Sequence, residues 1–185
     1  MPGEVVGPME FPGGRRFEVA VHDLLREETD AIVNAANGRL SHGGGVAAAI
    51  ARAAGPSLVR EGDELVRRQG DVPTGQAVVT TAGDLPFEGV IHAVGPRMGE
   101  GDEEDKVAHA LDAAFLRAHE RGWRSVSFPG ISSGIFAVPH DVCARAYFRA
   151  VKEFWARHGD SSVRLIRLVL FEGPLLDEVS ALLET

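Results

Sequence analysis

The chain is predicted to fold as an α/β protein, a three-layer α/β/α sandwich with a mixed, mostly parallel central sheet. Short apolar runs of strand length alternate with longer segments of helical periodicity along its 185 residues. The later apolar runs, at 89–94 and 163–171, are almost continuous, which is typical of strands covered on both faces. A chain of this length is expected to make one domain with a single core.

The first ordered element is expected near Arg16. Alternation of larger apolar residues with polar or small ones over 17–21 predicts a strand with one face more buried than the other. Residues 1–14 are rich in proline and glycine and hold few apolar anchors. We therefore predict a flexible N-terminal extension over 1–14 and the folded domain over 15–185.

The remaining elements follow from periodicity and from the residues that end each segment. Further strands are predicted at 31–34, 76–81, 89–94, 125–128 and 163–171. Helices are predicted at 46–54, 106–121, 139–158 and 174–183. Gly55-Pro56 is expected to end the first of these helices, and Gly122 and Gly159 the next two.

Composition excludes several classes of protein. The chain is 44% hydrophobic and 25% charged, as in ordinary globular proteins, and its formal net charge of -8 argues against a nucleic-acid-binding surface. Cys143 is the single cysteine, so no disulfide is expected and the thiol should pack inside a helix. The sequence shows neither metal-ligand spacing of Cys and His nor a segment suited to a membrane, so we expect a cytoplasmic monomer without metal, cofactor or membrane partner.

A glycine-rich loop is the strongest functional signal. Gly43, Gly44 and Gly45 follow a predicted strand and precede a predicted helix, where unpaired N–H groups favour an anion. A second loop, 129–139, follows the strand at 125–128 and also opens toward a helix. If the two loops face each other, each can hold one phosphate of a diphosphate.

A rival hypothesis is a serine esterase. Gly130-Ile131-Ser132-Ser133-Gly134 matches the nucleophile elbow, and His42 followed by three glycines matches an oxyanion-hole motif. The elbow needs a helix directly after the serine, whereas 135–138 intervene, and the chain is short for that fold. Asp141 and His158 would have to complete the triad from within one helix, which is poor geometry.

Several ordered segments resemble the macro domain family, which binds ADP-ribose. The resemblance runs from Val21 to about Phe171 and includes Asp23 and the segments 30–37, 43–46, 53–56, 72–75, 90–96 and 128–136. It implies one deep cleft in which Asp23 bonds the adenine amino group, Phe171 lies against the adenine face, and Asn37 bonds the distal ribose. The implied ligand-binding residues are Asp23, Leu24, Asn37, Gly43, Gly44, Gly45, Val46, Ser132, Ser133, Gly134, Ile135, Phe136 and Phe171.

The resemblance is less complete for catalysis. Family members that remove ADP-ribose from carboxylates carry an aspartate and a histidine where this chain has Ala47 and Ala51, and alanine can neither position water nor take a proton. Asn37 and Gly44 remain as candidates for holding water near the distal ribose. The implied function is binding of ADP-ribose or ADP-ribosylated protein with weak hydrolysis of ADP-ribosyl esters, the alternative being a reader without catalysis.

Some of these residues also allow a purely structural interpretation. Asp23 could cap a short helix through its carboxylate. Asn34 is expected to bond backbone in a tight turn, and His92 to be a buried core histidine. His42 borders the glycine loop and is the histidine most worth following, whereas the others, including His140, are expected at the surface or at caps.

Overall fold

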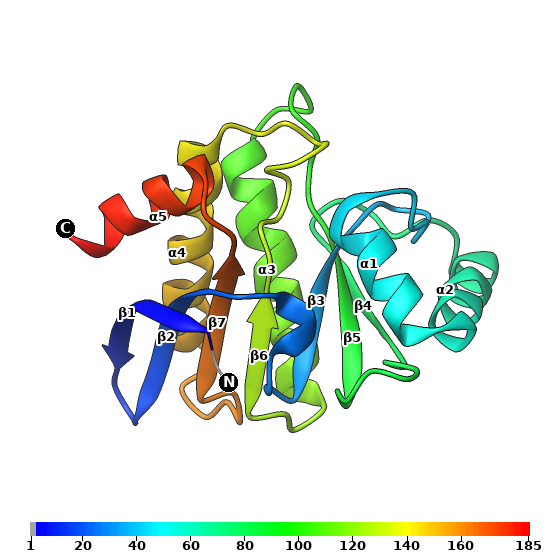
Figure 1. Cartoon of the computed structure of the whole chain (residues 1–185), viewed down its shortest axis with the longest axis horizontal. Helices are drawn as coiled ribbons and strands as arrows, with labels where there is room; N and C mark the ends of the chain where they lie inside the picture. Colours follow the sequence, from blue (N-terminus) through cyan, green and yellow to red (C-terminus); the bar gives the residue numbers. More distant parts are fainter. Residues whose placement is uncertain (1–2) are drawn as a thin grey trace.

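The computed structural model describes residues 3–185 and contains one seven-stranded sheet (Figure 1). The strand order is β1-β2-β7-β6-β3-β5-β4, in which β2, β7, β6, β3 and β5 run parallel and the two edge strands run antiparallel to their neighbours. The mixed, mostly parallel sheet is therefore confirmed. The strands are β1 Glu4–Phe11, β2 Arg15–Val21, β3 Ala31–Ala36, β4 Ala77–Thr80, β5 Gly89–Val94, β6 Ser125–Phe128 and β7 Leu165–Leu170.

Helices cover both faces of the sheet. The long helices α3 and α4 pack on one face, where side chains such as Phe115 and Phe154 meet Phe128 and Val126 in the main core. Helices α1 and α2 cover the β3–β5 part of the other face, where Ile50 is in the second core cluster. The helices are α1 Gly45–Ala54, α2 Pro56–Gln69, α3 Glu103–Glu120, α4 His140–Arg157 and α5 Pro174–Leu183, with a 3-10 turn η1 at Leu24–Arg26.

The predicted strands and helices are present, with shifts of a few residues at their ends. Helix α2 was not predicted, because Gly55-Pro56 was interpreted only as a stop signal. Gly55 does end α1 with a φ of 83°, but Pro56 is also the first residue of α2, a position that tolerates proline because its N–H would be unpaired. Cys143 packs in α4 as expected, and burial raises the pKa of its thiol to about 11.

The prediction of a flexible extension over 1–14 is wrong for most of that segment. Residues 4–11 form β1, which pairs antiparallel with β2, so main-chain hydrogen bonds replace the missing apolar anchors. Phe11 also packs on Trp155, with ring centroids 4.9 Å apart. Pro8 is compatible with this strand because β1 is at the edge of the sheet. Residues 1 and 2 lie outside the described part of the chain.

The strand β2 differs from its predicted pattern because both of its faces are buried. Glu18, expected on the exposed face, is only 8% exposed and forms an ion pair with Arg167 of β7. Arg167 also donates from Nε to Glu27 Oε1 at 2.6 Å, and Ser127 Oγ donates to the same oxygen at 2.7 Å. His22 Nδ1 donates to the other Glu27 oxygen at 2.8 Å. These bonds fix the connection between β2 and β3 over the sheet.

The charges in this network are stabilised mutually. Burial opposes ionisation of Glu27, but hydrogen bonds from Arg167, Ser127 and His22 outweigh burial and lower the pKa of Glu27. Burial likewise disfavours the charged form of Arg167, yet its contacts with Glu27 and Glu18 raise its pKa. The folded state therefore favours the ionised carboxylate and the charged guanidinium.

We expect Glu27→Gln to lower the free energy of unfolding at pH 7 by about 3 kcal/mol, because it leaves a buried guanidinium with one carboxylate fewer. Because the pKa of Glu27 is lowered on folding, its contribution is present above the unfolded value of 4.5 and is lost as pH falls below it. Urea unfolding between pH 7 and pH 3 should thus show a smaller acid-induced loss in Glu27→Gln. The exposed Glu64→Gln is the control, and equal pH dependence of all three proteins would contradict the prediction.

Candidate functional site

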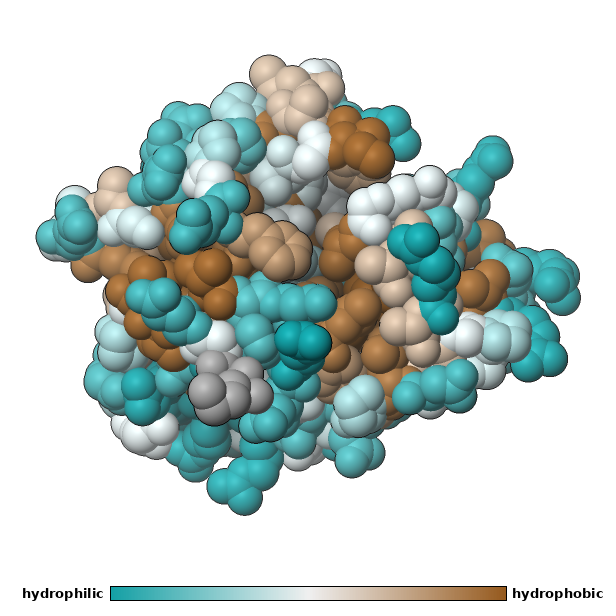
Figure 2. Space-filling view, in the orientation of Figure 1, coloured by the Kyte–Doolittle hydropathy of each residue, from teal (hydrophilic) through white to brown (hydrophobic). Residues whose placement is uncertain are grey.

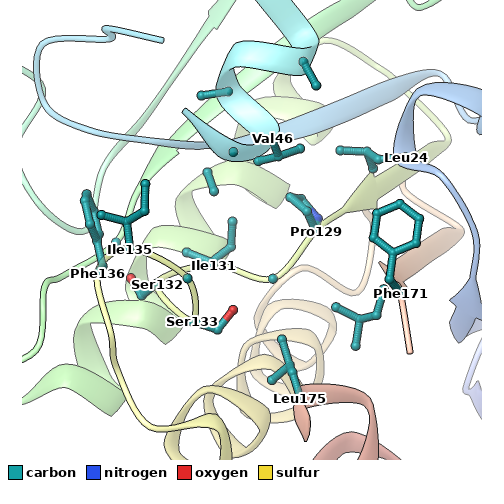
Figure 3. A pocket seen from close by; sticks show the side chains of 18 of the residues that line it. Leu24, Val46, Pro129, Ile131, Ser132, Ser133, Ile135, Phe136, Phe171 and Leu175 are labelled. Atoms are coloured by element: carbon teal, nitrogen blue, oxygen red, sulfur yellow. The ribbon is translucent and has the colours of Figure 1, made fainter. Parts of the chain in front are cut away.

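A cavity of about 880 Å³ lies at the carboxyl ends of the parallel strands. This volume is at the upper end of the range for small-molecule sites. Figure 2 shows its opening as a hollow bordered partly by apolar side chains, and Figure 3 shows the residues inside it. The lining includes every residue that the sequence analysis named for ligand binding: Asp23, Leu24, Asn37, Gly43, Gly44, Gly45, Val46, Ser132, Ser133, Gly134, Ile135, Phe136 and Phe171.

The strand order arranges these residues in a line. The segments after β2 and β7 supply Asp23 and Phe171 at one end, the loop after β6 supplies Ser132 in the middle, and the loop after β3 supplies Gly44. Arg97, after β5, lies at the far end. Four steps between neighbouring strands span roughly 19 Å, so the cavity suits an elongated ligand.

The glycine loop leads directly into α1. Gly44 is the N-cap and has no side chain with which to cap, so the first N–H groups of α1 remain available to a ligand. Gly45 has a φ of 59°, which favours glycine, whereas Gly44 has an extended φ of -176° that any residue can adopt. A Cβ added at Gly44 would lie 3.6 Å from Ile135 Cδ1. The glycine loop and the loop after β6 therefore face each other, as predicted (Figure 3).

Tyr147 of α4 holds the loop after β6 in place. Its hydroxyl donates to the Ile131 carbonyl oxygen at 2.6 Å and accepts from the Ile131 N–H at 2.7 Å. The Val138 N–H donates to the Ser132 carbonyl oxygen at 3.0 Å and closes the loop. The side chain of Tyr147 is fully buried, so it supports the backbone of this loop rigidly and keeps the loop N–H groups in a fixed direction.

Ser132 has an unusual environment within this loop. Its φ is 65°, its residue exposure is 6%, and its Oγ is buried without a hydrogen-bond partner among residues 3–185. A Cβ added at Gly95 would lie 2.2 Å from that Oγ, so Gly95 has to be glycine for the serine to fit. A buried hydroxyl normally has a partner. Ser132 lines the cavity, but its Oγ is buried against Gly95 and is not exposed to the cavity.

Asn37 lines the cavity, but its side chain is engaged within its own loop. Its Nδ2 donates to Ser41 Oγ at 2.7 Å, and its Oδ1 accepts from the N–H groups of Arg39 and Ser41, both at 3.1 Å. Contact with a ribose would have to share or replace these bonds. In this structure Asn37 shapes the start of the glycine loop.

Asp23 combines the two roles that the sequence left open. Its Oδ1 accepts from the Leu25 N–H at 3.0 Å and caps η1, while the residue also lines the cavity. Phe171 is 72% exposed and Leu24 is buried, and both border this end (Figure 3). The cap fixes the Asp23 backbone and leaves Oδ2 for a ligand.

The two alanines of interest are in different positions. Ala47 lines the cavity, whereas Ala51 is not part of its lining. His42 is next to this region rather than in the cavity, and its Nδ1 donates to the Ala47 carbonyl oxygen at 3.1 Å. The glycine loop is therefore also braced at the beginning of α1.

His92 is a satisfied core histidine, as predicted. Burial first, and then the charge of His42, lower its pKa to about 3, so its imidazole is neutral. Asn34 Nδ2 donates to His92 Nδ1 at 3.0 Å, and His92 Nε2 donates to Thr80 Oγ1 at 2.8 Å. The expectation that Asn34 bonds backbone in a turn is wrong, because the residue lies within β3 and pairs with a side chain of β5.

Arg97 and His140 line the cavity and were not predicted to do so. The Arg97 guanidinium lies 4.6 Å from the centroid of the Phe136 ring. The sequence signal that could have placed Arg97 in the cavity was its position directly after β5, at the edge of the sheet that carries the glycine loop. The pattern of charges gave no indication of either residue, because neither belongs to a cluster of basic residues.

The geometry gives the esterase hypothesis little support. After Ser132 the next helix is α4, which begins at His140. Asp141 forms an ion pair with Arg145, Oδ2 to Nη1 at 3.2 Å, and His158 packs at the other end of α4. Asp141 and His158 are thus at opposite ends of one helix, so they cannot form a triad with Ser132.

The described residues offer neither a metal site nor a membrane-spanning helix. Residues 3–185 contain no group of three His, Cys, Asp or Glu side chains placed to hold a metal ion. Within the same part of the chain, every helix is too short or too polar to cross a membrane.

Fold and cavity together define an open α/β-sheet protein with its ligand site at the carboxyl ends of the strands. The chain belongs to the Macro domain family, whose model matches residues 33–147. An Oceanobacillus iheyensis macrodomain with ADP has a similar structure, with a TM-score of 0.85, 30% sequence identity and coverage of 96% of this chain and 97% of that one. A Trypanosoma brucei macrodomain in complex with ADP-ribose has a TM-score of 0.79 at 28% identity, covering 90% of this chain and 68% of that one.

Relatives by sequence include proteins of different lengths. An Escherichia fergusonii protein named O-acetyl-ADP-ribose deacetylase is 42% identical over 145 residues, which cover 77% of this chain and 82% of that protein. An uncharacterised Thermotoga maritima protein is 44% identical over 167 residues, which cover 89% of this chain but 28% of that protein. The chain thus spans a little over a quarter of the Thermotoga relative.

We expect Tyr147→Phe to loosen the loop after β6, because it leaves the N–H and carbonyl groups of Ile131 without their shared partner. The free energy of unfolding should fall by about 2 kcal/mol, and amide hydrogen exchange should accelerate over residues 131–134. Phe148→Leu, a change to a neighbouring core side chain of the same helix, should not accelerate exchange specifically in that loop. Unchanged protection of the loop in Tyr147→Phe would contradict the supporting role of the hydroxyl.

Proposed function

We propose that this chain binds ADP-ribose and ADP-ribosylated derivatives in the cavity. The supporting observation is the pair of facing backbone loops, one opening α1 and one held by Tyr147, in the middle of a cavity that is elongated along the sheet edge. Two anion-binding loops suit a pyrophosphate, and the cavity continues on both sides of them. The macrodomain relatives with ADP and ADP-ribose support the same ligand class.

The linear arrangement of the lining residues supports a proposed place for each part of the ligand. The adenine would lie at the β2–β7 end, where Asp23 Oδ2 can accept from its amino group and Phe171 can cover its face. The pyrophosphate would lie between the glycine loop and the loop after β6. The distal ribose would then lie beyond the loop after β6, toward Gly95 and Arg97, which line the β5 end of the cavity.

We further propose slow hydrolysis of ADP-ribosyl esters. The Escherichia fergusonii relative supports this activity by its name, but Ala47 leaves the wall of the cavity beside α1 without a carboxylate. A water would have to be positioned by backbone N–H groups of the loop and by ligand phosphates, with the ester carbonyl as its target. The second candidate is a reader that binds without turnover, which the same alanine favours.

ADP-ribose should bind in the micromolar range, about -7 to -9 kcal/mol, and AMP far more weakly because it lacks the second phosphate and the distal ribose. Gly44→Glu should abolish binding, since the extended φ accepts a side chain and the carboxylate then repels the phosphates. Gly44→Gln is the matched control for bulk without charge. Calorimetry with ADP-ribose, AMP, ATP and NAD checks both expectations, and equal affinities for AMP and ADP-ribose would contradict the proposed function.

Ala47→Asp should raise the rate of hydrolysis of an ADP-ribosyl ester if a carboxylate facing the cavity is what the unmodified chain lacks. Ala47→Asn has nearly the same shape and no charge, so it should give no gain. Ala51→Asp places a carboxylate outside the lining and should also give none. Single-turnover rates measured at saturating protein report the rate of hydrolysis, and a separate measurement of affinity shows whether a variant has lost binding instead. Rapid turnover by the unmodified chain, with no gain in Ala47→Asp, would mean that the loop backbone and the substrate phosphates position the water without a carboxylate.

A further inference from the structure

The end of the cavity that follows β5 opens onto an exposed surface that we call the distal rim, formed by Arg97, Met98, Ile135 and Phe136. Arg97, Ile135 and Phe136 line the cavity, and Met98 is the neighbour of Arg97 in the chain. Ile135 is 81% exposed and Met98 56% exposed. Large apolar side chains that are exposed together commonly mark a contact surface.

The distal rim is held in place before any ligand arrives. The Met98 N–H donates to the Phe136 carbonyl oxygen at 2.8 Å, which joins the segment after β5 to the loop after β6. The Arg97 guanidinium lies 4.6 Å from the Phe136 ring centroid, a distance suited to a cation–π contact. Beyond the rim, Glu103 Oε1 accepts from the Gly99 N–H at 2.8 Å. A partner would therefore meet a preformed surface.

Arg97 also brings a positive charge that has no carboxylate partner among residues 3–185. Arg97 is exposed, and it is the one lysine or arginine among the described residues that line the cavity. The ion pairs within residues 3–185 are made by other arginines. The chain as a whole carries a formal net charge of -8. An uncommitted cation at the mouth of the cavity can attract a partner that carries the opposite charge.

We propose that the distal rim binds the polypeptide attached to the distal ribose, and that Arg97 selects acidic side chains next to the modified residue. The inference rests on the proposed function, because it takes the adenine to lie at the β2–β7 end of the cavity. Whatever is linked to the other end of ADP-ribose then leaves past β5 and meets the rim. Met98 and Ile135 contact the aliphatic parts of the segment, whereas a small acyl group would leave them uncovered.

The test compares three short peptides that carry ADP-ribose on a central glutamate through a hydrolysis-resistant linkage. The flanking residues are glutamates, glutamines or lysines, and each affinity is divided by that of free ADP-ribose for the same protein. The unmodified chain should prefer the glutamate-flanked peptide to the glutamine-flanked one about threefold, with the lysine-flanked peptide weakest. The preference should shrink as salt is raised, because the contact is exposed.

Two variants and one control identify the side chains responsible. Arg97→Gln should abolish the preference among peptides, and Met98→Ser should lower all three relative affinities by about twofold without changing their order. Arg121→Gln is the matched control, since its guanidinium also lies near an aromatic ring, 5.8 Å from the Trp123 centroid, but outside the cavity. Its preference should equal that of the unmodified chain.

Several outcomes would overturn the assignment of the distal rim. They are equal binding of the three peptides, a preference that survives in Arg97→Gln, and an Arg97-dependent gain seen only for ADP-ribose with a terminal phosphate. Failure of free ADP-ribose to bind would instead refute the proposed function. Binding of free ADP-ribose without peptide preference would remove only the inference about the rim, so the two failures are distinguishable.

Discussion

The ion pairs of buried Arg167 are the interaction on which the geometry of the site depends most. A guanidinium inside a protein needs carboxylates close to it, and Arg167 has Glu18 on the neighbouring strand and Glu27 on the connection between β2 and β3. Because Glu27 follows Asp23 by only four residues, these ion pairs also fix the segment that borders the β2–β7 end of the cavity. Ion pairs that lie outside the cavity thus set the position of residues that line it.

The middle of the cavity is built differently, from backbone rather than from charged side chains. The glycine loop supplies the N–H groups at the start of α1, and hydrogen bonds of the Asn37 and His42 side chains hold that loop in place. The Tyr147 hydroxyl holds the loop after β6 in place in the same way. Oriented N–H groups can hold an anion without a buried cation, which is compatible with the negative net charge of the chain. The single lining arginine, among the described residues, is at the distal end, where it can serve selection rather than phosphate binding.

Most of the fold could be predicted because its signals are local. A nearly continuous apolar run located β5, alternation of serine with apolar residues located β6, and helical periodicity located α5, each with its observed bounds. The elements that were missed are those in which tertiary contacts override local signals. β1 is a strand although it contains Pro8, since pairing with β2 supplies its hydrogen bonds. α2 begins at the same Gly55-Pro56 pair that ends α1, and its Leu58 packs in the second core.

The sequence by itself determined which loops line the cavity, because glycine-rich stretches that follow parallel strands lie at the carboxyl edge of the sheet. The tertiary structure decided what each side chain in those loops does. Asn37 hydrogen-bonds within its own loop, the Ser132 Oγ is buried against Gly95 without a partner among residues 3–185, and Arg97 lies at the mouth of the cavity. The physical reason is that hydrogen-bond partners and burial depend on residues far apart in the chain, such as Tyr147 and Ile131 or Gly95 and Ser132, which meet only when the sheet assembles.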